Sequence, residues 1–176
     1  MNLYMVRHGE TGWNRANRLQ GQHDVPLNST GLAQANQLHQ EIMKWHLKFD
    51  TVYASPLQRT LKTAQIIAPN QKIIVDHNLK ERDIGQFAGQ DCSVLFDCEI
   101  DFLDEALNSS AFGVEPIRVF QARATTFLTL LRANHPLNAR ILVVTSNGFM
   151  KRLHYALFPH LTPPNFQNAQ LYHFEI

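Results

Sequence analysis

The chain is 176 residues long, which predicts one compact domain with a sizeable hydrophobic core. Apolar residues make up 44% of it and charged residues 18%, a balance typical of a globular protein rather than a disordered one. The net charge of +1 provides no basic excess for binding nucleic acid or a membrane surface, so we expect neither as a partner.

The first elements are a strand and a helix separated by an irregular segment. The apolar run at residues 3–6 predicts a buried strand that ends just before a glycine. Residues 10–28 have no clear period, and Ser29 or Thr30 then caps a helix over roughly residues 30–47. The apolar face of this helix is predicted to contain Leu32, Ala35, Leu38, Ile42 and Trp45.

A second strand and helix follow directly. Residues 51–54 predict the strand, which ends at Ser55 and Pro56. Serine as N-cap with proline at the first helical position is typical of a helix start, and the pattern continues to about Ala68. Arg59 is therefore expected in the first turn of this helix.

The middle of the chain is less regular. Residues 73–75 predict a third strand, residues 92–107 a weak helix, and residues 108–113 a flexible loop. Pro116 then opens a long helix. The buried side of that helix is predicted to contain Ile117, Phe120, Ala124, Phe127 and Leu131.

The C-terminal part adds a strand, a helix and an edge strand. Residues 140–146 are the strongest strand pattern in the chain, and a helix runs from there to about Phe158. Apolar and polar residues alternate at the end of the chain, which predicts an edge strand through Tyr172, Phe174 and Ile176. Strands that alternate with helices predict a largely parallel sheet covered on both faces.

Polar residues follow three of the predicted strands: Arg7 and His8, Ser55 to Arg59, and Asn147 with Gly148. Parallel sheets bind ligands at the carboxyl ends of their strands, so we expect these segments to meet at one rim. A neutral histidine can attack phosphorus, and arginine offers a planar fork of donors to phosphoryl oxygens. The rim is therefore predicted to bind a phosphoryl group, the alternative being a strand that merely ends in Arg-His.

Several separated motifs occur in an order that closely resembles the histidine phosphatase superfamily, in its phosphoglycerate-mutase-like branch. The resemblance extends from Met1 to at least Arg152. Its motifs are Arg7-His8-Gly9-Glu10-Thr11, Trp13-Asn14, Arg18, Gln20-Gly21, Asp24, Pro26-Leu27, Gly31, Ser55-Pro56-Leu57-Gln58-Arg59-Thr60, Thr63-Ala64, Leu79-Lys80-Glu81 and Gly85.

The resemblance implies a three-layer α/β/α sandwich with a mostly parallel central sheet, formed by residues 1–176 as a single domain. It further implies hydrolysis of a phosphomonoester through a phosphohistidine on His8. Its nucleophilic nitrogen must be unprotonated while the other nitrogen donates to a backbone carbonyl. Arg7 and Arg59 are expected to clamp the phosphate, and Asn14 to add a neutral donor.

Glu81 is the candidate general acid, because a departing alkoxide needs a proton. The alternative is that residues 80–83 form a charged run that faces water. In some members a second acid lies in a Trp-Glu-Gly motif, but this chain has Phe87-Ala88-Gly89 there. Glu81 would therefore act alone, with Asp83 as a distant substitute for the acid.

Near the C-terminus the family has Val-x-Ser-His-Gly, whereas this chain has Val144-Thr145-Ser146-Asn147-Gly148. Asn147 and Gly148 are expected to contact the phosphate, but asparagine lacks the charge of the family's second histidine. Three interpretations stay open: a slow enzyme, an enzyme suited to an unusual substrate, and a protein that binds phospholigands without turnover. His23 is a further candidate to replace the missing histidine, and a phosphoglycerate mutase is a further alternative for the function.

No cofactor is expected, because the chain lacks both nucleotide-binding patterns, Gly-x-x-x-x-Gly-Lys and Gly-x-Gly-x-x-Gly. No metal is expected either, because the histidines lack the spacing of metal ligands. The other histidines are expected at helix surfaces and in loops. The N-terminus lacks the basic region of a signal peptide, and no apolar run has the length of a membrane span. With two cysteines, Cys92 and Cys98, a cytoplasmic location is expected, a redox pair being the alternative. The partner would be a small phosphate ester, and the oligomeric state stays open.

Overall fold

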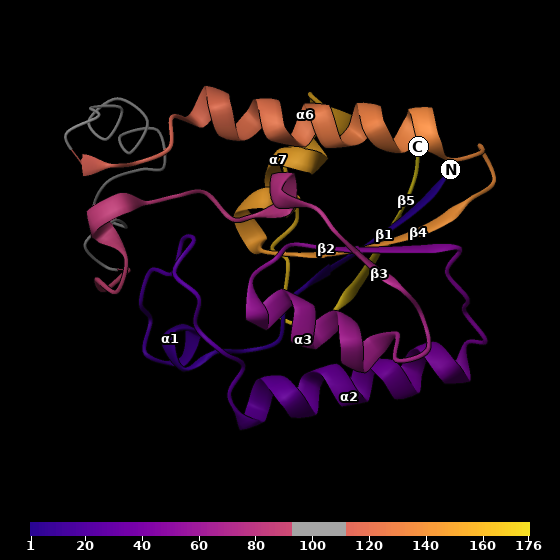
Figure 1. Cartoon of the computed structure of the whole chain (residues 1–176), viewed down its shortest axis with the longest axis horizontal. Helices are drawn as coiled ribbons and strands as arrows, with labels where there is room; N and C mark the ends of the chain where they lie inside the picture. The colour runs from indigo at the N-terminus through magenta and orange to yellow at the C-terminus, as the bar shows by residue number, and fades with distance from the viewer. Residues whose placement is uncertain (93–111) are drawn as a thin grey trace.

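The computed structural model describes residues 1–92 and 112–176, and a five-stranded sheet of order β3-β2-β4-β1-β5 forms its centre (Figure 1). Four strands are parallel neighbours, whereas β5 runs antiparallel to β1. The strands are β1 (Asn2–Arg7), β2 (Thr51–Ala54), β3 (Ile73–Val75), β4 (Arg140–Thr145) and β5 (Leu171–Glu175).

Helices cover both faces of this sheet. In Figure 1, α6 (Ile117–Asn134) and α7 (Asn147–Leu157) lie on one side of it, and α2 (Ser29–Lys44) and α3 (Gln58–Ile67) on the other. The predicted three-layer α/β/α sandwich with a mostly parallel sheet is confirmed. Short elements complete the described chain: α1 (Gly12–Arg15) and the 3-10 turns η1 (His77–Leu79) and η2 (Gly85–Phe87).

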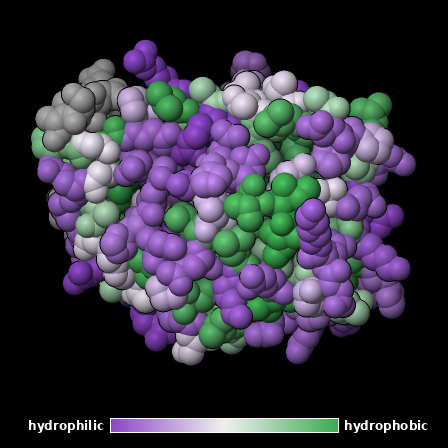
Figure 2. All heavy atoms as spheres, viewed as in Figure 1, coloured by the Kyte–Doolittle hydropathy of each residue, from purple (hydrophilic) through white to green (hydrophobic). Residues whose placement is uncertain are grey.

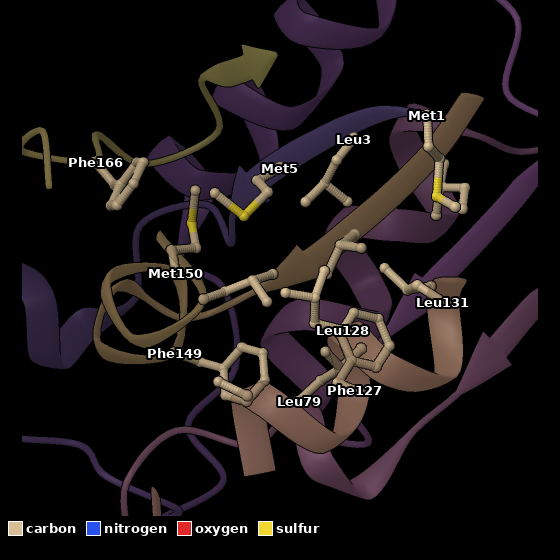
Figure 3. Close-up of a cluster of buried hydrophobic side chains, with 14 of the residues drawn as sticks. Met1, Leu3, Met5, Leu79, Phe127, Leu128, Leu131, Phe149, Met150 and Phe166 are labelled. Carbon is tan, nitrogen blue, oxygen red and sulfur yellow. The ribbon is translucent and has the colours of Figure 1, made fainter. Parts of the chain in front are cut away.

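Each face of the sheet has its own apolar core. Toward α6 and α7, the β1 side chains of Leu3 and Met5 pack with Phe127 and Phe149 (Figure 3). Toward α2 and α3, alternate residues of the same strands pack with the helices, as Val6 does beside Leu38. The period of two along each strand therefore supplies both cores.

The helix predicted over residues 30–47 begins one residue earlier and ends at Lys44. Its cap is Asn28, whose side chain accepts a hydrogen bond from Gly31 N at 2.8 Å, so the prediction of Ser29 or Thr30 was wrong. The buried stripe consists of Gly31, Ala35, Leu38 and Ile42.

Two members of the predicted apolar face of this helix are exposed. Leu32 is 37% exposed because it lies about 100° around the helix from the inward-facing Gly31. Trp45 is 54% exposed because it lies beyond the last helical turn.

The next helix, α3, begins two residues later than predicted. Its N-cap is Leu57, so Ser55 is not the cap and Pro56 is not the first helical residue. Ser55 continues the sheet instead, since its N–H donates to Val144 O at 3.2 Å and its Oγ lies 2.6 Å from Thr60 Oγ1. Arg59 does lie in the first turn, as predicted.

The C-terminal predictions need smaller changes. Pro116 caps α6 instead of opening it, and β4 ends at Thr145, one residue early. The edge strand is confirmed as β5, at one end of the sheet. The predicted weak helix over 92–107 and loop over 108–113 fall mainly on residues 93–111, which lie outside the described residues.

On the face in Figure 2 most atoms are hydrophilic, and apolar atoms gather in a central patch. The edge strand β3 contributes the exposed apolar residues Ile74 and Val75. Among the described helices, none combines the length and the apolar character needed to cross a membrane.

Candidate active site

The carboxyl ends of the parallel strands meet at one edge of the sheet. Arg7, the last residue of β1, pairs with Thr145, the last residue of β4, and Ala54 at the end of β2 pairs with Val144. His8 continues this register, because its N–H donates to Thr145 O at 3.0 Å. The predicted meeting of three segments at one rim is therefore observed.

A cavity of about 190 Å³ opens at this edge. It contains six of the seven predicted site residues; Gly148 is not among those that line it. Larger hollows of about 360 and 540 Å³ lie along α2 and α6, away from this rim. The cavity is lined by Arg7, His8, Asn14, Arg18, Leu19, Gln20, Gly21, Arg59, Glu81, Ile84, Cys92, Ser146 and Asn147.

His8 is held in one orientation and kept neutral. Its side chain is buried, and Nδ1 lies 2.8 Å from Gly9 O. A carbonyl can only accept, so Nδ1 carries the proton and donates, which leaves the lone pair of the neutral ring on Nε2. Burial lowers the pKa of His8 well below its usual range, and the nearby Arg59 and Arg7 lower it further.

Two arginines lie beside this histidine, Arg59 buried and Arg7 half-buried. Arg59 is fully buried, and its Nη1 and Nη2 donate to His23 O and Gly21 O, each at 2.7 Å. Arg7 Nη1 donates to Phe166 O at 3.0 Å. Burial lowers the pKa of both guanidinium groups, and the nearby Glu81 carboxylate partly offsets this by raising it. Both groups stay protonated, because arginine does not lose its proton in proteins.

Several polar atoms around the cavity have no partner among the described residues. Nε of Arg7 and of Arg59, Oγ of Ser146 and Oδ1 of Asn147 are buried and make no hydrogen bond. Leaving a buried donor unpaired costs roughly 1–3 kcal/mol, more for a charged one. The free N–H and O–H groups beside two cations make this cavity suited to an anion.

Asn14 contributes a further donor from α1. Its Oδ1 accepts from the N–H of Thr11 at 3.1 Å, and the hydroxyl of Thr11 in turn accepts from the N–H of Asn14. This reciprocal cap fixes the orientation of the amide. The Nδ2 amine of Asn14 has no partner within residues 1–92 and 112–176, and so it is available to a ligand.

Glu81 is anchored by backbone N–H groups at the edge of the cavity. Oε1 accepts from Arg82 N and Oε2 from Gly148 N, both at 2.8 Å. The residue is half-buried and lines the cavity, which argues against the alternative of a charged run that faces water.

Gly148 differs from the expectation that it contacts the phosphate. Its N–H is already bound to Glu81, and a Cβ added at this position would lie 2.2 Å from Glu81 Oε1. In this structure Gly148 therefore makes room for Glu81 and orients it.

Asn147 is the first residue of α7, and Ser146 before it is the N-cap. The Asn147 amide reaches the cavity with its oxygen unpaired. The buried hydroxyl of Ser146 was not predicted as a site residue; its place beside Asn147 at the end of a strand is the signal that would have indicated it.

Other candidates named from the sequence lie elsewhere. The ring of His23 stacks on Trp13 at 4.7 Å and is not in the cavity wall, so it does not replace a second histidine. Asp83 accepts from Gly85 N and does not line the cavity. His154 is buried and His173 lies in β5, which corrects the expectation that the remaining histidines are at helix surfaces and in loops.

Cys92 lines the cavity, which the sequence did not predict, and Cys98 lies outside the described residues. Burial, with a smaller contribution from Asp91, raises the pKa of the Cys92 thiol. In the described part of the chain, no three His, Cys, Asp or Glu side chains are grouped so that they could hold a metal ion.

The family model for the histidine phosphatase superfamily (branch 1) matches residues 3–176. The chain belongs to this superfamily. A phosphoglycerate mutase-like protein of Arabidopsis thaliana is 32% identical over 86% of this chain and 69% of its own length. Phosphoserine phosphatase 1 of Hydrogenobacter thermophilus is 34% identical over 88% of this chain and 75% of its own length.

Among solved structures, this histidine phosphatase chain is similar to the phosphoserine phosphatase of Entamoeba histolytica in complex with 3-phosphoglyceric acid. The two are 28% identical with a TM-score of 0.79, over 98% of this chain and 89% of the other. The chain spans only about half the length of the bacterial GpmB relatives it matches. These relatives are phosphatases or mutases, and the Entamoeba protein binds a small phosphorylated molecule.

Proposed function

We propose that this chain hydrolyses small phosphomonoesters without a metal ion, through a phosphohistidine on His8. The observation that carries the proposal is a buried, neutral imidazole whose Nδ1–H donates to Gly9 O, in the same cavity as the guanidinium groups of Arg7 and Arg59. This arrangement supplies a nucleophile and two positive charges that balance those of a phosphate dianion. We further propose that residues 1–176 act as one functional unit.

In the first step, Nε2 of His8 attacks phosphorus while the bond to the ester oxygen breaks. Arg7, Arg59 and Asn14 bind the phosphoryl oxygens and stabilise the charge that develops on them. Glu81, in its carboxylic acid form, gives its proton to the leaving oxygen. The products are an alcohol, a phosphohistidine and the Glu81 carboxylate.

In the second step, the Glu81 carboxylate takes a proton from water, and the water oxygen attacks the phosphohistidine. The nitrogen–phosphorus bond breaks, which returns neutral His8, protonated Glu81 and inorganic phosphate. Anchoring of both Glu81 oxygens by backbone N–H groups keeps the side chain in reach for both proton transfers.

In this proposal Asn147 takes the position of the family's second histidine. An amide has a donor of similar reach but no positive charge, and the loss of one charged donor commonly slows such a reaction by about 10²–10³. We therefore propose a slow or substrate-restricted enzyme. Binding of phospholigands without turnover, and a phosphoglycerate mutase, are the alternatives that the experiment separates.

The experiment measures release of inorganic phosphate from a panel of phosphate esters in the presence of a chelator. We expect turnover that survives chelation and that His8→Ala abolishes, together with acid-labile phosphate on the wild-type protein. His39→Ala is a matched control, because His39 Nδ1 also lies near a backbone carbonyl, Ile67 O, but away from the cavity.

Three results would contradict the proposal in different ways. Turnover that requires a divalent ion would indicate metal-assisted hydrolysis. Phosphate binding without turnover on any ester would favour the binding protein. Transfer of phosphate between two positions of phosphoglycerate, without net release, would favour the mutase.

A further inference from the structure

Glu81 lies in a segment that has no regular secondary structure to hold it. Residues 80–83 belong to neither a helix nor a strand. Backbone carbonyls in this segment and just before it are bound by side chains instead. Leu79 O accepts from the hydroxyl of Thr145, at the end of β4, at 2.6 Å. The position of Glu81 must therefore come from tertiary contacts.

Most of these contacts come from one side chain of α6, that of Arg123. Its Nη1 donates to Asn78 O and, at 2.8 Å, to Lys80 O. Its Nη2 donates to Glu81 O at 3.2 Å. A single guanidinium group thus binds three carbonyls of the segment that presents Glu81.

Glu115 in turn fixes Arg123. The two form a bidentate ion pair, with Nε–Oε1 at 2.8 Å and Nη2–Oε2 at 2.7 Å. The side chains are 17% and 12% exposed, so the pair is largely shielded from solvent screening. The Arg123 guanidinium also lies over the Phe120 ring, 4.8 Å from its centroid.

The backbone of Glu115 binds the residues that follow Glu81. Glu115 N donates to Asp83 O at 2.8 Å, and Glu115 O accepts from Arg82 Nε at 2.8 Å. The segment is therefore held before Glu81 by Arg123 and after it by Glu115.

We propose that Arg123 and Glu115 are positioning residues for the general acid, which act by fixing the backbone of residues 78–83 so that Glu81 reaches both the cavity and Gly148 N. This inference rests on the proposed role of Glu81. Neither residue lines the cavity, so we expect neither to contact the substrate. They affect the reaction through proton transfer to the leaving group.

A defect in a general acid has a signature that general loss of structure does not have. Esters with a poor leaving group need the proton, whereas aryl phosphates with a good leaving group need it much less. The experiment therefore measures kcat and KM on an alkyl phosphate and on p-nitrophenyl phosphate for Arg123→Met, Arg123→Lys and Glu115→Gln. Glu81 is also the proposed base of the second step, which both esters share, so the comparison uses kcat/KM, which reports only the steps up to the phosphohistidine. We expect kcat/KM to fall by about 10-fold or more on the alkyl ester and by less than about 3-fold on the aryl ester.

Arg118→Met is the matched control. Arg118 is an exposed arginine on the same helix, with no hydrogen bond or ion pair in the described part of the chain. Arg118→Met should leave kcat/KM on both esters unchanged. Equal loss of kcat/KM on both esters in the Arg123 and Glu115 variants, or no loss, would overturn the positioning role.

Glu81→Gln separates this inference from the proposal on which it rests. If Glu81→Gln shows the leaving-group signature and the Arg123 and Glu115 variants do not, the positioning inference is wrong and the proposed function stands. If Glu81→Gln itself lacks the signature, the assigned role of Glu81 is wrong. In the double variant with Arg123→Met, we expect no further change in the ratio of the two rates.

A crystal structure of Arg123→Met gives a readout independent of turnover, and Glu115→Gln serves if that variant does not fold. We expect the contact of 2.8 Å between Glu81 Oε2 and Gly148 N to be lost. A Glu81 carboxylate that keeps this contact would overturn the inference even in a protein inert on every ester.

Discussion

At the scale of single residues, the chemistry of His8 follows from its surroundings. An exposed imidazole titrates near pH 6.5, where half of it would be unable to attack phosphorus. Burial and the charges of Arg59 and Arg7 oppose protonation of His8. The hydrogen bond to Gly9 O keeps the proton of the neutral ring on Nδ1. Neutrality and tautomer are thus set by two separate features.

The lowered pKa of His8 predicts its protonation state as pH falls. We expect Nε2 to stay unprotonated to a pH below 6.5, because the folded protein disfavours the cation. Ring ¹⁵N chemical shifts measured between pH 8 and pH 5 on the ligand-free protein check this. A transition of His8 at or above pH 6.5 would contradict it.

Asn147 gives the second prediction at this scale. Asn147→His would place a donor that can carry charge beside a cavity whose unpaired atoms include Asn147 Oδ1. We expect turnover of p-nitrophenyl phosphate to rise by about 10-fold or more, which corresponds to roughly 1.4 kcal/mol in the transition state.

Comparison across esters separates the interpretations of Asn147. A gain on the aryl phosphate with a loss on one cellular ester would indicate that asparagine suits that ester. A variant inert on every ester, beside a wild-type protein that binds phosphate, would favour the binding protein.

At the scale of elements, the start of α7 connects the sheet to Glu81, the proposed general acid. Because β4 ends at Thr145 and α7 begins at Asn147, the free N–H groups of the first helical turn face the rim. One of them, that of Gly148, binds Glu81.

Gly148→Ala tests this contact. The added methyl group would lie 2.2 Å from Glu81 Oε1, so the carboxylate must move. We expect kcat to fall by about 10²-fold, the lower range for loss of a general acid, while thermal unfolding changes little. Gly12→Ala is the control, since a Cβ there has no neighbour within 4 Å. Full activity of Gly148→Ala would contradict the assigned position of Glu81.

A second feature of α7 concerns stability. His154 is 5% exposed, lies among the rings of Phe158, Phe166 and Phe174, and has a buried Nδ1 without a partner in the described chain. Burial lowers its pKa below that of the unfolded chain. The unfolded state therefore binds more protons, and the free energy of unfolding falls as pH drops below about 6.5.

We expect His154→Phe to reduce the loss of stability between pH 7 and pH 5. His8 has a lowered pKa too, so part of the loss will remain in the variant. Urea unfolding at both pH values measures the difference, with the exposed His160→Gln as control. An unchanged pH dependence in His154→Phe would show that His154 does not contribute.

At the scale of the whole molecule, the fold brings more positive than negative charge to one rim. Arg7 comes from the end of β1 and Arg59 from the first turn of α3, and both line a cavity where Glu81 is the single carboxylate among the described residues. Two cations that line one cavity repel each other, and a bound anion relieves this repulsion. Ligand binding and stability are therefore coupled.

Phosphate or vanadate should raise the midpoint of thermal unfolding. Binding to the folded state alone stabilises by about 2.7 kcal/mol at 100 times Kd. Arg7→Gln should abolish the shift, whereas Arg15→Gln should keep it, because Arg15 is exposed and pairs with Glu10 away from the cavity. An equal shift in wild type and Arg7→Gln would place the anion elsewhere.

The sequence by itself determined the order of strands and helices and the residues at the rim. Continuous apolar runs predict buried strands, and parallel strands necessarily bring Arg7, His8 and Asn147 to one edge. Arg59 was placed correctly even though its helix begins late, because the strand before it ends at the same rim.

The tertiary structure alone decided which partner each polar group has. Gly148 N binds a carboxylate 67 residues away, and Arg123 binds carbonyls 42 to 45 residues away. Asn28 became the helix cap because its amide both binds Gly31 N and donates to Glu10 Oε1. Local sequence patterns show which residues are apolar and where the chain can turn. A hydrogen bond between distant segments depends instead on the packing of the whole chain.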